Sequence, residues 1–192
     1  MTRLFMVRHG PTHARGMVGW SDLPADLGDR AALARLSAHL PTEAVVISSD
    51  LSRAKTTADA IQGARPRLPH RAGLREIHFG AWELRPFAEI EAEDPERIRA
   101  YWEHPGDVRP PGGESWNEVR ARVDGEIDRL LAAHAGGAVV VVCHFGVILT
   151  QVQRALDLTA EAAFAHRIDN LSVTELAHGA QGWSLGRINH LP

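Results

Sequence analysis

The sequence has a single cysteine, little net charge and no long hydrophobic run, and each absence excludes a class of protein. Cys143 alone cannot form an internal disulfide or a multi-cysteine zinc site. The 21 basic and 24 acidic side chains leave a formal charge of −3, which gives no reason to expect nucleic acid or an anionic membrane as partner. No apolar run is long enough to cross a membrane, and the apolar segment at the N-terminus is too short for a signal peptide. We therefore expect a cytoplasmic protein.

The rest of the composition is that of a globular chain. Hydrophobic residues make up 44% and charged residues 23% of the 192 positions, which excludes a disordered, collagen-like or disulfide-stapled protein. A chain of this length suffices for one hydrophobic core. We therefore expect a single domain over residues 1–192.

Three short apolar runs predict buried strands. They cover residues 4–7, 44–47 and 138–142, and each leads directly into a polar cluster. Continuous runs rich in β-branched residues are typical of parallel strands buried on both faces by helices. The prediction is an α/β fold with three layers, in which helices flank a mostly parallel central sheet.

Helical spacing of apolar residues occurs between and after these runs. It is found over residues 33–40, 51–61 and 119–131, and Ser115 with Glu118 has the pattern of a capping box before the last of these segments. The chain therefore alternates strands with helices, as a covered parallel sheet requires.

Two further segments have other patterns. Residues 171–176 alternate apolar and polar side chains, and this alternation predicts edge strands near the C-terminus. Residues 104–113 are rich in proline and glycine, which predicts an irregular loop of the kind that borders a site.

The polar residues after the three runs are expected to meet. Arg8 and His9 follow the first run, Arg53 lies shortly after the second, and His144 follows the third. In open α/β sheets, ligands bind beyond the carboxyl ends of the strands. Two arginines and two histidines at one point would repel each other without an anion, and a guanidinium matches phosphate oxygens in bidentate fashion. The sequence therefore predicts a phosphate site.

A neutral imidazole beside a phosphate is a competent nucleophile. Neighbouring arginine charges would lower the pKa of His9 and keep its ring unprotonated near neutral pH, so His9 is the candidate nucleophile. A carboxyl group could protonate the leaving alkoxide and later activate water. Glu76 is the first candidate for this role, and Glu83 and Glu114 come next.

Four blocks of the sequence resemble the histidine phosphatase, or phosphoglycerate-mutase-like, superfamily. In order along the chain they are VRHGPT at residues 7–12, SSDLSRAKTTA at 48–58, LREIHFGAWE at 74–83 and VCHFGVI at 142–148. The resemblance implies the phosphoglycerate-mutase-like fold, with His9 as the phosphorylated nucleophile and Glu76 as the proton donor. It also implies that Arg8, Arg53 and His144 complete the phosphate pocket, without a metal or other cofactor.

Within the superfamily, residues 79–85 are most similar to α-ribazole and adenosylcobalamin phosphatases of cobalamin biosynthesis. The chain departs from the common pattern at Pro11, where many members carry Glu, and at Arg15, where many carry a phosphate-binding Asn. The expected substrate-binding residues are Thr12, Arg15, Trp20, Trp82 and Phe145. Core positions are an equal alternative for the three aromatic residues, and Cys143 is expected to be a small buried residue.

The sequence thus predicts a phosphomonoesterase that hydrolyses a small cytoplasmic phosphate ester through phosphohistidine, α-ribazole phosphate and adenosylcobalamin phosphate being candidates. One alternative is a phosphoglycerate mutase, and another is a phosphate-binding domain without turnover. The only partner expected is a small-molecule phosphate ester, with no nucleic acid and no membrane. The sequence leaves the oligomeric state open.

Overall fold

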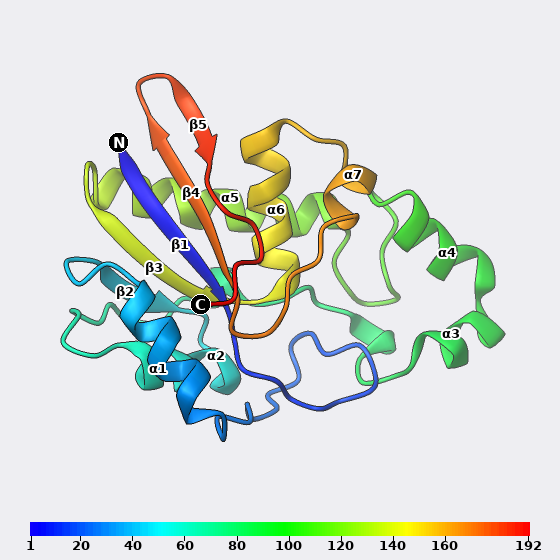
Figure 1. The fold of residues 1–192 in the computed structure, drawn as a ribbon. Coiled ribbons are helices and arrows are strands. Elements are labelled where there is room, and N and C mark those ends of the chain that lie inside the picture. Colours follow the sequence, from blue (N-terminus) through cyan, green and yellow to red (C-terminus); the bar gives the residue numbers. More distant parts are fainter.

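The computed structural model describes residues 1–192 and contains one five-stranded sheet flanked by helices (Figure 1). The strands are β1 (Thr2–Arg8), β2 (Val45–Ser48), β3 (Ala138–Cys143), β4 (Val173–Gly179) and β5 (Gly182–Leu185). The α-helices are α1 (Arg30–His39), α2 (Ser52–Ile61), α3 (Phe87–Glu93), α4 (Pro95–Glu103), α5 (Trp116–Ala133), α6 (Phe145–Leu156) and α7 (Ala160–Phe164). Two short 3-10 helices, η1 (Ala72–Leu74) and η2 (Gly80–Trp82), lie between α2 and α3.

The sheet order β2-β3-β1-β4-β5 places the three predicted buried strands side by side. β3 pairs in parallel with both β1 and β2, whereas β4 and β5 join antiparallel at the other edge. In this register Arg8 lies opposite Cys143, and Ser48 lies opposite Val142. The carboxyl ends of β1, β2 and β3 therefore align at one edge. The two predicted C-terminal strands are present, but only β5 is an edge strand, because β4 pairs with both β1 and β5.

Alternate residues of the central strands enter two hydrophobic cores, which explains why these strands are apolar throughout. Leu4, Met6 and Val141 belong to the core that contains α5 and α6. Phe5 and Val140 belong to the core that contains α1 and α2. The helices thus form one layer on each face of the sheet, and the predicted three-layer α/β fold is confirmed.

The helical segments predicted from apolar spacing correspond to α1, α2 and α5. The capping box before α5 is present, because Ser115 Oγ accepts from the Glu118 amide at 3.2 Å and the Ser115 amide donates to Glu118 Oε2 at 2.8 Å. The apolar spacing did not indicate α3, α4, α6 or α7. α3 and α4 form a lobe that projects beyond the sheet (Figure 1).

Residues 104–113 form neither helix nor strand, as predicted. This loop packs beside the segment that follows Glu76, because the Ala81 amide donates to the Pro111 carbonyl at 2.8 Å. Just after the loop, the Glu114 amide donates to the His78 carbonyl, also at 2.8 Å. None of the helices combines the length and the apolar composition that crossing a lipid bilayer requires.

Candidate active site

Four polar side chains from separate parts of the chain are buried beyond the aligned strand ends. His9 follows β1, Arg53 lies in the first turn of α2, Glu76 follows η1, and His144 joins β3 to α6. Their exposed fractions are 6% for His9, 1% for Arg53, 6% for Glu76 and 0% for His144. The ring centroids of His9 and His144 are 5.1 Å apart, and Arg53 Nε lies 3.2 Å from His9 Nε2.

The hydrogen bonds of His9 determine its tautomer. Nδ1 lies 2.6 Å from the Gly10 carbonyl oxygen, which can only accept, so Nδ1 carries the proton. Nε2 therefore has the lone pair and faces the N–H of Arg53 Nε. Burial, and then the charge of Arg53, lower the pKa of His9 to about 3, which keeps the ring neutral at physiological pH. His9 is thus a neutral imidazole with Nε2 available as nucleophile.

Arg53 is held by backbone carbonyls of the loop that follows β1. Its Nη2 donates to the Gly19 carbonyl at 2.6 Å and its Nη1 to the Ser21 carbonyl at 2.8 Å. A guanidinium has five N–H groups, so donors on both terminal nitrogens remain for a ligand. The buried guanidinium is therefore fixed in orientation and can still bind an oxyanion.

Arg8 and His144 present polar atoms that have no partner within the protein. Arg8 Nη1 donates to the Ile168 carbonyl at 2.6 Å, whereas Arg8 Nε and both ring nitrogens of His144 are buried without a hydrogen bond. Burial, followed by the neighbouring His9, Arg53 and Arg8, holds the pKa of His144 well below its ordinary value. Buried donors without partners beside two guanidinium groups are suited to a tetrahedral oxyanion.

Glu76 lies at the N-terminus of α6. Its Oε1 accepts from the amides of Ile77 and Gly146, each at 3.0 Å. Burial raises the pKa of Glu76 above its ordinary value, although these hydrogen bonds and the charges of Arg53 and Arg8 oppose the shift. This environment favours the protonated carboxyl group, which can donate its proton.

The structure places the predicted substrate-binding residues in different environments. Phe145 is half-buried beside the pocket, with the Arg8 guanidinium 5.6 Å from its ring centroid. Trp20 is half-buried, and its Nε1 donates to the Glu76 carbonyl at 2.8 Å. Thr12 is half-buried and Arg15 is exposed, both on the loop after β1. Trp82 is only 2% exposed and packs edge-on against Tyr101 in the core, so it does not line the pocket.

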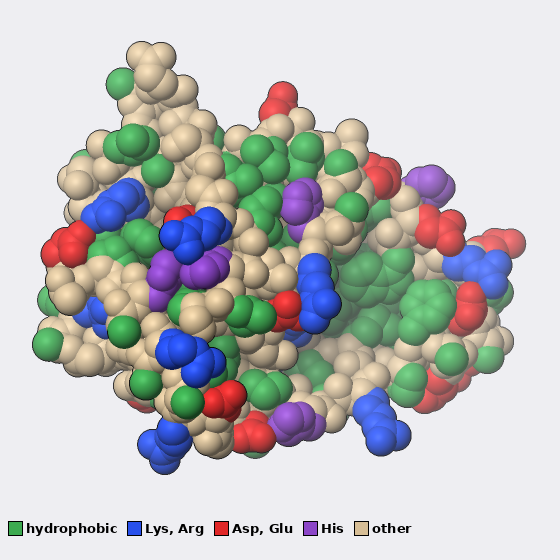
Figure 2. All heavy atoms as spheres, in the orientation of Figure 1, with side chains coloured by type: hydrophobic (Ala, Val, Ile, Leu, Met, Phe, Trp, Pro, Cys, Tyr) green, Lys and Arg blue, Asp and Glu red, His purple; other side chains and the backbone are tan.

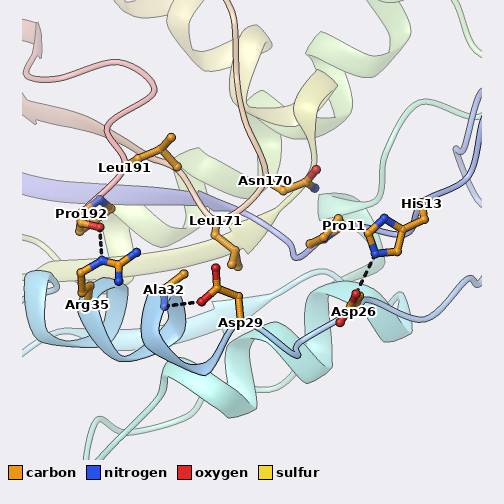
Figure 3. A pocket seen from close by; sticks show the side chains of 10 residues that line it. All are labelled: Pro11, His13, Asp26, Asp29, Ala32, Arg35, Asn170, Leu171, Leu191 and Pro192. Carbon is orange, nitrogen blue, oxygen red and sulfur yellow. Dashed lines mark hydrogen bonds and ion pairs between the residues drawn. The ribbon is translucent and has the colours of Figure 1, made fainter.

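The largest cavity lies elsewhere, near the loop after β1 and the C-terminus. It measures about 530 Å³ and is bordered by residues that include Pro11, Asp29, Arg35 and Asn170 (Figure 3). None of the four buried polar residues described above lines it. No three His, Cys, Asp or Glu side chains lie close enough together to hold a metal ion. Arg8, Arg53 and the neutral imidazoles make the site around His9 suitable for an anion.

Residues that the sequence did not indicate hold the predicted ones in place. Asn170 Nδ2 donates to the His9 carbonyl at 2.8 Å, across 161 positions of sequence. Arg122 donates to the carbonyls of Gly73, Arg75 and Glu76, and also pairs with Glu114 at 2.8 Å. Gly146, whose amide donates to Glu76 Oε1, did have a signal, because it stands two positions after His144 in one of the quoted blocks.

Comparisons with known proteins agree with this geometry. A family model described as the histidine phosphatase superfamily (branch 1) matches residues 4–191. The bifunctional protein Rv2228c of Mycobacterium tuberculosis is 33% identical over 201 residues, which cover 97% of this chain but only 53%, about half, of that relative. The adenosylcobalamin/alpha-ribazole phosphatase of Salmonella typhimurium is 30% identical, with 87% of this chain and 86% of the relative covered.

A solved structure shows the same architecture. Bacillus stearothermophilus YhfR superposes with a TM-score of 0.91 at 27% identity, with 100% of this chain and 98% of that chain covered. The match thus includes the sheet, the α3–α4 lobe and the segments that carry the four buried polar residues. This chain belongs to the histidine phosphatase superfamily.

Proposed function

We propose that the protein is a phosphomonoesterase that works through a phosphohistidine intermediate on His9. The observation that carries the proposal is the fixed tautomer of this buried imidazole. Nδ1 is bound to the Gly10 carbonyl, so the lone pair of Nε2 points toward Arg53, in the pocket that also contains Arg8 and His144. Membership of a superfamily of phosphatases and mutases supports the same chemistry.

The first chemical step transfers the phosphoryl group to the protein. His9 Nε2 attacks phosphorus, the bond between phosphorus and the ester oxygen breaks, and Glu76 donates its proton to the departing alkoxide. Arg8, Arg53 and His144 stabilise the negative charge on the other three phosphoryl oxygens. The products of this step are an alcohol, phosphohistidine and an ionised Glu76.

The second step returns the protein to its starting state. The ionised Glu76 takes a proton from water, whose oxygen attacks phosphorus, and the bond from phosphorus to Nε2 breaks. Inorganic phosphate leaves, and His9 is again a neutral imidazole. One carboxyl group therefore serves first as acid and then as base, and neither step needs a further co-reactant.

We further propose that the substrate carries a flat or apolar alcohol portion. Phe145 lies beside the pocket, and the surface between α7 and the α3–α4 lobe is hollowed where hydrophobic side chains gather (Figure 2). Trp102 of α4 and Phe164 of α7 are half-buried, and their ring centroids are 5.5 Å apart. Aromatic surface of this kind suits a base-like group. α-Ribazole phosphate and adenosylcobalamin phosphate fit this description, and the Salmonella relative acts on substrates of these names.

A hydrolysis panel tests the proposed function. It should contain α-ribazole phosphate, adenosylcobalamin phosphate, sugar phosphates, nucleotides, phosphoglycerates and one aryl phosphate. We expect phosphate release, with kcat/KM for one base-containing ester well above the rest. Isomerisation of 3-phosphoglycerate with 2,3-bisphosphoglycerate and without phosphate release would favour a mutase. Absence of both reactions would favour a binding domain without turnover.

A further inference from the structure

The segment from Gly19 to Ser21 contacts two charged side chains with opposite requirements. The carbonyl groups of Gly19 and Ser21 accept from the two terminal nitrogens of Arg53, at 2.6 and 2.8 Å. The amide groups of the same two residues donate to a single oxygen, Glu83 Oε1, at 2.7 and 2.8 Å. The loop therefore connects a carboxylate on one side with the guanidinium of the pocket on the other.

This arrangement fixes the direction of the two carbonyls. Each of these carbonyls lies in the peptide plane that follows the one whose N–H binds Glu83. Holding a plane on each side, Glu83 before the residue and Arg53 after it, restricts the backbone dihedral angles of Gly19 and Ser21 in a loop without a ladder partner. Glu83 Oε1 binds both N–H groups, and charge-assisted hydrogen bonds of this length are the stronger kind. The Leu84 amide also donates to the Met17 carbonyl at 2.7 Å, which joins the Glu83 segment to the start of the loop.

The segment from Gly19 to Ser21 packs closely against its neighbours. A Cβ atom on Gly19 would lie 2.1 Å from the Ile77 carbonyl and 2.8 Å from Glu83 Oε2. The loop thus lies directly against the segment that contains Glu76 and against the Glu83 carboxylate. The charge of Glu83 also opposes the lowering of the pKa of Arg53 by burial, so it favours the charged guanidinium.

We propose that Glu83 is a positioning residue that sets the orientation of the Arg53 guanidinium through the backbone of residues 19–21. The inference rests on the proposed function, in which Arg53 binds the transferring phosphoryl group. Glu83 Oε1 is occupied by two backbone amides, and no hydrogen bond joins the Glu83 carboxylate to His9, Arg8, Arg53 or His144. This role differs from that of a proton donor, for which Glu83 was a candidate after Glu76.

The two roles predict different kinetics. Loss of a proton donor slows alkyl phosphates much more than aryl phosphates, because an alkoxide needs a proton and a good phenolate leaving group does not. Loss of a positioning residue weakens binding of the phosphoryl group itself, which is common to both ester types. We therefore expect Glu83→Ala to lower kcat/KM by about tenfold for alkyl and aryl phosphates alike.

The decisive experiment is a double-mutant cycle on the binding of inorganic phosphate, measured by calorimetry, which requires no turnover. Glu83→Ala and Arg53→Ala should each weaken phosphate binding by about tenfold or more. If Glu83 acts through Arg53, the double variant should bind phosphate within about twofold of Arg53→Ala alone. Losses that multiply in the double variant would overturn the inference, as would an alkyl-selective loss in Glu83→Ala.

Two further variants keep the test independent of folding. Glu83→Gln retains an oxygen that can accept both amides, so it should bind phosphate within about threefold of wild type even if the alanine variant is unstable. Glu89→Ala removes an exposed carboxylate of α3 that pairs with Arg85, and it should bind phosphate as tightly as wild type. Wild-type affinity for phosphate in both Glu83 variants would overturn this inference but not the proposed function. A wild-type protein that binds no phosphate would overturn both.

Discussion

Gly146 gives the sharpest test of the role of Glu76, because only a glycine fits beside the carboxyl group. A Cβ atom at this position would lie 2.4 Å from Glu76 Oε1, whereas an ordinary van der Waals contact is 3.4–4 Å. The same atom would lie 3.0 Å from two side-chain carbons of Ile77. In Gly146→Ala the carboxyl group must therefore move by about 1 Å, and a displacement of that size can cost about 100-fold in rate.

The loss should depend on the leaving group. We expect single-turnover rates of phosphoryl transfer in Gly146→Ala to fall by about 100-fold for an alkyl phosphate and by less than about tenfold for 4-nitrophenyl phosphate. Alanine is the better helix former, which offsets part of the strain at the start of α6, so the fold should persist. Circular dichroism and urea denaturation check that it does.

Gly125→Ala is the matched control. Gly125 also lies in a helix, α5, but a Cβ atom there would meet no atom within 4 Å. This variant should keep wild-type rates and gain up to about 1 kcal/mol in the free energy of unfolding. A Gly146→Ala protein with the wild-type ratio of alkyl to aryl rates would show that Glu76 is not the proton donor, or that its carboxyl group does not lie at the start of α6.

The remaining predictions concern the other residues of the pocket. His9→Ala should abolish the acid-labile, base-stable phosphate that quenching traps on wild type, and equal trapping in both would refute the assignment of the nucleophile. Arg53→Lys should lower kcat/KM by about tenfold or more, because a point charge cannot replace a bidentate fork, and near-normal kinetics would place Arg53 outside the pocket. Since the pKa of Glu76 is raised, kcat for an alkyl ester should fall as pH rises through that pKa, and Glu76→Gln should lack this limb in a pH profile. The pKa of His9 is about 3 in the folded protein, whereas an unfolded histidine titrates near 6.5, so the unfolded chain binds more protons between these values. The free energy of unfolding should therefore decrease as pH falls from about 6.5 to about 3. Urea denaturation should show a shallower decrease in His9→Ala.

The parallel part of the fold could be predicted because its physical signal is local. Strands β1 and β3 are apolar at every position that faces either core, and α5 has a capping box at its start. α6 escaped prediction, although its sequence separates apolar from polar residues. Its polar residues Thr150, Gln151 and Gln153 are buried with the rest of residues 146–153, so they do not form the solvent-facing side that usually marks a surface helix. The short helices of the α3–α4 lobe, of 7 and 9 residues, offer too few turns for a clear apolar stripe.

The chemistry of the site could also be predicted in part from the sequence. Residues that follow neighbouring parallel strands meet at one edge of the sheet, and this rule indicated His9 and His144 from the sequence alone. The orientation of the site side chains could not be predicted, because it depends on groups distant in sequence. Examples are the Gly19 carbonyl that binds Arg53 and the Asn170 side chain that binds the His9 carbonyl. Trp82 illustrates the same limit, since a tryptophan next to a site block can face either the pocket or the core.

The protonation states of the pocket match the order of the two chemical steps that we propose. Burial keeps His9 and His144 neutral, so the positive charge of the pocket comes from Arg8 and Arg53, which matches a phosphate ester dianion. In the proposed mechanism Glu76 begins protonated, because an ionised carboxylate here would repel that dianion, and its raised pKa favours this state. Once its proton has left with the alcohol, the same raised pKa makes the carboxylate a stronger base toward water. Burial of one carboxyl group thus favours proton donation in the first step and proton abstraction in the second.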